Sequence, residues 1–195
     1  MAHLARGGRL KNEPLPPMTL HFRRICKAPA CYLSGLIICS LTMPTFTHNA
    51  PLTIAGLALR TSNATAFEDI PRHWGAFFAQ QVLANIPDKI NDALYAVYTG
   101  FDRIPQTADD IYSLGYTLVI GAAVSSTAHL PPTLTSTLIP ATRRAVFAVE
   151  PAQPEQVGAQ WQKIWQMQDL QRVFAPDYEH YASDGKISIL VSVAT

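Results

Sequence analysis

The sequence of 195 residues has little cysteine and little charge, and both shortages exclude classes of protein. Its three cysteines, Cys26, Cys31 and Cys39, all lie before residue 43. The rest of the chain can therefore hold neither a disulfide framework nor a thiolate zinc site. Only 15% of the residues are charged while 48% are hydrophobic, which is typical of a globular protein with a buried core.

Familiar catalytic and metal-binding motifs are also missing. The sequence contains no G-x-S-x-G nucleophile motif, no phosphate-binding loop and no dinucleotide-binding fingerprint. The histidines after residue 43 are His48, His73, His129 and His180, and their spacing is not that of metal ligands. We expect His73 and His180 to be exposed rather than catalytic, and we expect no metal and no cofactor.

The N-terminal part of the chain lacks the sequence pattern of a folded domain. Residues 1–44 are expected to be an extension that is disordered or is translated from a mistaken start ahead of Met43. An apolar run from Ala30 to Met43 is shorter than the roughly 20 residues of a membrane-spanning helix. Residues 20–45 also suit an export signal, but no clean cleavage site follows. We therefore expect a cytoplasmic protein.

Charge is distributed unevenly along the chain. Residues 1–42 hold six basic residues against one acid, a net charge of +5, whereas residues 43–195 hold nine basic and thirteen acidic residues, a net charge of −4. An acidic body disfavours direct binding of nucleic acid and favours cationic partners.

The hydrophobic pattern of residues 45–195 predicts a single α+β domain made of two similar units. In the first unit strands are predicted at 52–60, 93–99 and 116–124, with a helix at about 67–82. In the second a strand at 134–139 continues past Pro140 at 143–149, and a helix at 154–167 and strands at 177–181 and 187–193 follow. Two such strand-helix-strand-strand units can pair about a pseudo-twofold axis around a central ligand cleft.

One predicted strand, Asp177-Tyr-Glu-His-Tyr181, combines acids with aromatic residues. Alternation along a strand places Asp177, Glu179 and Tyr181 on one face. Tyr178 and His180 then lie on the other face. A carboxylate among aromatic rings suits a cationic ligand, although Glu179 also suits a solvent-exposed strand face.

Six segments between residues 50 and 193 share a pattern with a known family. They are Ile70–Phe78, Leu94–Thr99, Tyr116–Gly121, Ile139–Phe147, Trp161–Trp165 and Phe174–Tyr181. In content and order they resemble the effector-binding domain of AraC-type and related transcription regulators, also called the GyrI-like small-molecule-binding domain. The resemblance implies a duplicated strand-helix-strand-strand fold around a cleft, in which Glu179 faces ligands that are often cationic and aromatic.

The candidate ligand-binding residues are one acid and six aromatic side chains. They are Glu179, Tyr181, Trp74, Tyr98, Tyr116, Trp165 and Phe78. The aromatic positions also suit a buried core. The resemblance implies a stand-alone protein that binds a lipophilic, cationic small molecule and has no DNA-binding domain of its own. One alternative is a hydrolase of reactive ring compounds with Glu179 as acid or base. Another is a module that binds DNA gyrase or a regulator.

Overall fold

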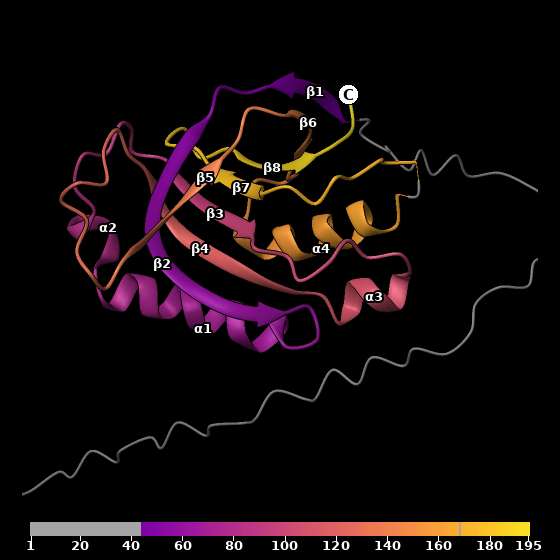
Figure 1. Cartoon of the computed structure of the whole chain (residues 1–195), viewed down its shortest axis with the longest axis horizontal. Coiled ribbons are helices and arrows are strands. Elements are labelled where there is room, and N and C mark those ends of the chain that lie inside the picture. Colours follow the sequence, from indigo (N-terminus) through magenta and orange to yellow (C-terminus); the bar gives the residue numbers. More distant parts are fainter. Residues whose placement is uncertain (1–43, 168) are drawn as a thin grey trace, which may run out of the picture. The chain divides into compact units, whose positions relative to one another are not determined.

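The computed structural model describes residues 44–167 and 169–195, which contain strands and helices in a mixed order (Figure 1). The strands are β1 (Thr45–His48), β2 (Leu52–Ser62), β3 (Leu94–Thr99), β4 (Gly115–Ala123), β5 (Thr135–Ile139), β6 (Arg143–Ala148), β7 (Asp177–Tyr181) and β8 (Ile187–Ser192). The helices are α1 (Ala66–Ala79), α2 (Val82–Asn85), α3 (Ala108–Tyr112) and α4 (Pro154–Trp165). The predicted α+β class is confirmed. Up to residue 43, the predicted N-terminal extension lies outside the described residues.

The strands form one antiparallel sheet in the order β1-β6-β8-β7-β3-β4-β2-β5. Two segments have the predicted strand-helix-strand-strand order, β6-α4-β7-β8 and, apart from the short helices α2 and α3, β2-α1-β3-β4. They meet in the middle of the sheet, where β3 pairs with β7 and Ala96 lies opposite Glu179. Outward from this pair, β4 and β2 follow on one side and β8 and β6 on the other. The twofold relation between the two units stays a prediction.

The stretch around Pro140 differs from the prediction of one interrupted strand. It forms two strands, of which β5 pairs with β2 and β6 pairs with β8, at opposite ends of the sheet. The four Cα steps between Ile139 and Arg143 span roughly 14 Å at most, so the sheet must curl until its ends approach each other. Figure 1 shows this curl in the strong bend of β2. Proline has no amide hydrogen to donate to a strand ladder, which explains the break.

Three short elements are not predicted by the sequence pattern. They are β1, α2 and α3, each of four or five residues. Elements of this length carry too little hydrophobic periodicity to be recognised. Strand β1 adds to the edge of the sheet by pairing with β6, with Thr45 opposite Val146.

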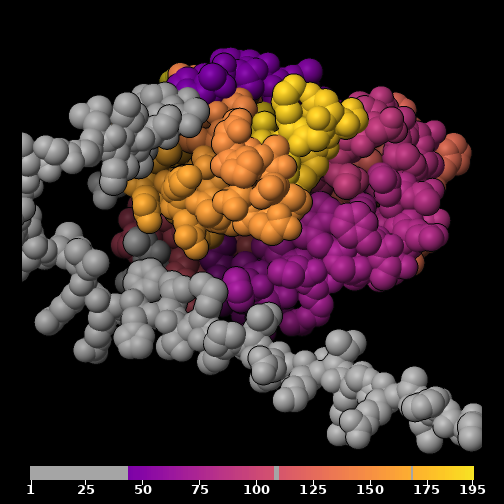
Figure 2. Space-filling model, turned by 180° about the vertical axis from the view of Figure 1, so that it is seen from behind, coloured from indigo at the N-terminus to yellow at the C-terminus, as the bar shows by residue number. Residues whose placement is uncertain are grey.

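The curled sheet buries side chains on both faces. Side chains from both units, among them Ile54, Tyr95 and Tyr178, form one cluster on the face without helices. On the other face, the side chain of Phe77 from α1 fills a cluster over β2, β3 and β4, and Trp161 from α4 fills one over β6 and β8. Both helices therefore cover the same face of the sheet, one over each unit. Figure 2 shows α4 in orange and α1 in purple on one side of the molecule.

Candidate functional site

A cavity of about 860 Å³ lies between α1 and α4, above the central strands β3 and β7. This volume is within the usual range of about 300–1,000 Å³ for small-molecule sites. Most of its lining is apolar or aromatic, from both units of the fold. The aromatic residues in this lining are Phe67, Trp74, Phe78, Tyr98, Phe101, Tyr116, Trp161, Trp165, Phe174 and Tyr181.

Helix α1 divides its apolar residues between the core and the cavity. Phe77 is buried in the core, whereas Phe67 is 92% exposed and Phe78 is largely exposed at the cavity. The ring of Trp74 stacks on Phe78 with 5.7 Å between centroids and meets Tyr181 edge-on at 5.4 Å. The apolar stripe therefore predicts the helix correctly, but it does not separate core residues from cavity residues. Pro71 lies inside the helix.

Helix α4 closes the opposite side of the cavity with two tryptophans one turn apart. Trp161 is buried against the sheet, while Trp165 is 39% exposed. Their rings are 6.3 Å apart. Residues four apart lie on one helix face, so this spacing directs both indoles toward the cavity.

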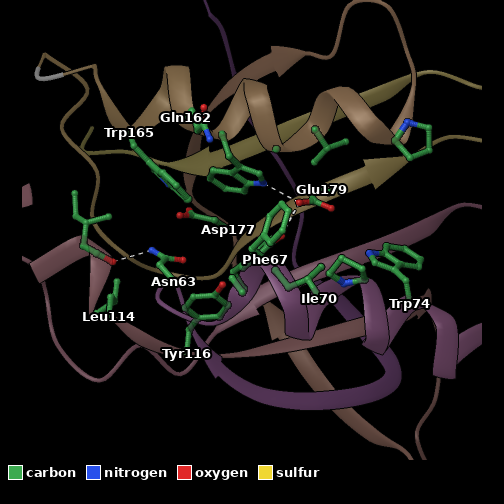
Figure 3. Close-up of a pocket in the computed structure, with 18 of the residues that line it drawn as sticks. Asn63, Phe67, Ile70, Trp74, Leu114, Tyr116, Gln162, Trp165, Asp177 and Glu179 are labelled. Carbon is green, nitrogen blue, oxygen red and sulfur yellow. Dashed lines mark hydrogen bonds between the residues drawn. The ribbon is translucent and has the colours of Figure 1, made fainter. Parts of the chain in front are cut away.

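Glu179 lies at the centre of the cavity wall and is only 3% exposed. Its Oε1 atom accepts hydrogen bonds from the Tyr98 hydroxyl at 2.6 Å and from the Trp161 indole nitrogen at 2.7 Å. Its Oε2 atom accepts one from the Tyr181 hydroxyl at 2.7 Å. Figure 3 shows the Glu179 carboxylate beside aromatic side chains of the cavity. The alternative of a solvent-exposed strand face is therefore wrong.

Burial raises the pKa of the Glu179 carboxyl because a charged group loses its hydration there. The hydrogen bonds from Tyr98, Tyr181 and Trp161 favour the ionised form and offset part of this effect. Burial and the charge of Glu179 raise the pKa of the Tyr98 and Tyr181 hydroxyls. Both hydroxyls therefore remain protonated hydrogen-bond donors at neutral pH. All three donors to Glu179 are uncharged.

The second acid of the strand, Asp177, has a different environment. Its Oδ2 atom accepts a 2.7 Å ion-pair hydrogen bond from Arg172, and its Oδ1 atom accepts hydrogen bonds from the backbone and hydroxyl of Ser192. Asp177 is therefore neutralised within the protein, unlike Glu179. Tyr178 and His180 lie on the opposite face, where both rings contact Tyr95. The predicted alternation is confirmed.

The structure brings all seven predicted site residues to the same cavity. They are Glu179, Tyr181, Trp74, Tyr98, Tyr116, Trp165 and Phe78. Sequence reasoning missed Trp161, which binds Glu179 directly, and Asn63, which comes from the loop after β2. The four-residue spacing of Trp161 and Trp165 could have indicated that Trp161 also faces the cavity. No comparable pattern in the sequence indicates Asn63.

Metal ligands and histidines contribute little to this site. Among the described residues no group of three His, Cys, Asp or Glu side chains could hold a metal ion. His73 was expected to be exposed, but it is buried, with its Nε2 atom 3.0 Å from the carbonyl oxygen of Leu57. His180 is half-buried against Tyr95. Hydrogen bonding and ring stacking overcome the usual tendency of histidine to stay at the surface.

Comparison with known families decides the identity of this fold. Residues 42–191 match the GyrI-like small molecule binding domain. The chain belongs to this family. The resemblance seen in the sequence is thereby confirmed. No curated protein matches the sequence.

Several solved structures have a fold similar to that of this chain. An integron cassette protein from the mobile metagenome of Vibrio cholerae has a TM-score of 0.60 and 18% identity, covering 78% of this chain and 97% of that chain. The protein SAV2435 bound to tetraphenylphosphonium has a TM-score of 0.61 and 16% identity. The match covers 77% of this chain and 93% of that chain. A putative transcription regulation protein from Staphylococcus aureus has a TM-score of 0.56 and 16% identity. The match covers 78% of this chain and 98% of that chain.

No helix among the described residues has the length and apolar character needed to cross a membrane.

Proposed function

We propose that this GyrI-like domain binds a lipophilic, cationic, aromatic small molecule and that Glu179 supplies the opposite charge. The observation that carries this proposal is the environment of Glu179. It is buried, and among the described residues its hydrogen-bond donors are the neutral side chains of Tyr98, Trp161 and Tyr181. A buried carboxylate without a cationic partner is costly, and a ligand cation would offset that cost.

The aromatic walls support the same ligand class. Trp74 and Phe78 stack on the α1 side, and Trp161 and Trp165 lie on the α4 side. Aromatic faces attract cations by about 0.5–2 kcal/mol each and also cover the apolar parts of a ligand. The tetraphenylphosphonium bound to SAV2435, a protein of similar fold, is a cation of this kind.

The biological role that we propose is that of an effector-binding protein of the transcription-regulator type. The fold that this chain shares with a putative transcription regulation protein supports that role. Binding of DNA gyrase or of a regulator stays a prediction.

The proposal can be tested with two ions of the same shape and opposite charge, tetraphenylphosphonium and tetraphenylborate. We expect the protein to bind the cation more tightly. Glu179→Gln keeps the shape of the side chain and should weaken cation binding by about 2–5 kcal/mol. The control is Glu155→Gln, an equal charge change at an exposed residue of the same cavity, which should have a much smaller effect. Equal affinity for both ions, or an affinity for the cation that Glu179→Gln does not change, would overturn the proposal.

Hydrolysis of reactive ring compounds is a second candidate, favoured by the raised pKa of Glu179 and by its contact with two tyrosine hydroxyls. A carboxyl group with a raised pKa can donate or accept a proton near neutral pH. In that case Glu179→Gln would lower turnover about 100-fold or more, even for neutral substrates that still bind. Turnover assays with wild type and Glu179→Gln separate the two candidates.

A further inference from the structure

We infer that the cavity has a second polar subsite, formed by Tyr116 and Asn63, that binds a neutral amide-like group of the cationic ligand. This inference rests on the proposed function and adds to it a specific chemical requirement. The ligand would carry a positive charge near Glu179 and, elsewhere on its aromatic frame, a group that both accepts and donates hydrogen bonds.

Tyr116 provides the first observation. Its side chain is 3% exposed and lines the cavity, and within the described part of the chain its hydroxyl has no hydrogen-bond partner. The other two tyrosines of the site, Tyr98 and Tyr181, both donate to Glu179. Figure 3 shows the Tyr116 hydroxyl pointing into the cavity. The hydroxyl oxygen is not among the fully buried polar atoms that lack a partner, so it is reached from the cavity and is available for a ligand.

Contacts around Tyr116 hold its hydroxyl in place. Its ring lies 5.4 Å from the ring of Tyr98 and 6.1 Å from that of Phe101. Burial and the nearby charges of Glu179 and Asp69 raise the pKa of Tyr116, so the hydroxyl keeps its proton and can donate.

Asn63 supplies an acceptor beside this donor. Its Nδ2 atom donates to the carbonyl oxygen of Ile111 at 2.8 Å, which fixes the orientation of the side-chain amide. The remaining oxygen then faces the cavity, as Figure 3 shows. Thr61 pairs with Tyr116 across β2 and β4, and Asn63 follows two residues later. Asn63 lies in the turn directly after β2, and both side chains line the same cavity, so that one ligand can contact both.

The chemistry of the two residues selects the ligand group. The Tyr116 hydroxyl can donate to a carbonyl, and the Asn63 oxygen accepts from an N–H. A primary amide offers both. A carboxylate could accept from Tyr116 but would be repelled by Asn63 and by the nearby charge of Glu179.

Tetraphenylphosphonium and its carbamoyl derivatives, with the amide at the meta or para position of one ring, form a suitable set of probes. Wild type should bind the better carbamoyl isomer about threefold to tenfold more tightly than the parent, the value of one net hydrogen bond. Tyr116→Phe should abolish this preference, so that this variant binds the carbamoyl isomer and the parent cation with equal affinity. The matched control is Tyr112→Phe, which removes a hydroxyl from an exposed tyrosine outside the cavity lining.

The outcomes distinguish this inference from the proposed function. If the parent cation binds and depends on Glu179, but neither isomer gains a Tyr116-dependent preference, the subsite is wrong and the proposed function stands. If neither tetraphenylphosphonium nor its carbamoyl derivatives bind, the proposed function fails. The affinities of the neutral compounds naphthalene and 2-naphthamide then test the subsite. A preference for the amide that depends on Tyr116 supports the subsite, and equal affinity for the two compounds overturns it. Thermal unfolding of each variant verifies that the fold is intact.

Discussion

The indole nitrogen of Trp161 donates a 2.7 Å hydrogen bond to the Oε1 atom of Glu179 and so joins helix α4 to strand β7. The same oxygen accepts from Tyr98 on β3, in the other unit of the fold. The carboxylate therefore lies where the two units meet, held by donors from both.

Replacing Trp161 with Phe removes this donor but keeps an aromatic ring. We expect the free energy of unfolding to fall by about 1.5–3 kcal/mol, the range for a hydrogen bond to a charged group. The pKa of Glu179 should rise further, since one of the bonds that lowers it is lost. Urea denaturation measures the first effect. Trp165→Phe is the control, because the exposed Trp165 makes no hydrogen bond to Glu179, and its change should be about 1 kcal/mol or less. Equal losses in both variants would contradict this role of Trp161.

Cation binding should depend on pH through Glu179. Because burial raises its pKa, the carboxyl remains protonated to a higher pH than an exposed glutamate does. A bound cation favours the ionised form and lowers that pKa, so affinity should rise with pH through the pKa of the free protein and then level off. Below that pKa, binding should release a proton. Calorimetric titration with tetraphenylphosphonium, from about pH 4.5 to about pH 8 in two buffers of different ionisation enthalpy, measures both effects. Glu179→Gln should bind without this pH dependence, and the same dependence in both proteins would assign it to another group.

The pairing of β2 with β4 should require glycine where the two backbones approach. Gly56 lies opposite Gly121, and a Cβ atom on Gly121 would be 1.9 Å from the backbone oxygen of Ala55. Gly121→Ala should lower the free energy of unfolding by about 1–3 kcal/mol or more, because backbone must move. Gly75→Ala, on the exposed side of α1 with no atom within 4 Å of the added Cβ, should raise it by about 0.5–1 kcal/mol. Stabilisation by Gly121→Ala would show that the strands can separate without cost.

Residues 43–195 should fold without the N-terminal extension. The family match covers residues 42–191, and the first strand begins at Thr45. A fragment of residues 43–195 should therefore unfold in one cooperative thermal transition at nearly the temperature of the full chain. A broad transition, or a large drop in melting temperature, would show that the extension is part of the fold.

Local patterns of the sequence were sufficient for most elements and for the facing of the central acid. Strand β7 lies at the predicted residues, and alternation alone placed Glu179 and Tyr181 on the same face. The helical spacing of Ile70, Trp74 and Phe77 predicted α1. These features follow from periods of 2 and 3.6 residues, which depend only on backbone geometry.

Only the tertiary structure decided which side chains surround Glu179 and which strands pair. Hydrophobic periodicity identifies residues that avoid water, but it does not distinguish the buried Phe77 from Phe67, which lines the cavity. The bond from Trp161, the neutralisation of Asp177 by Arg172 and the separation of β5 from β6 all depend on elements brought together by the curl of the sheet. Such contacts join segments that are distant in sequence, so local patterns cannot specify them.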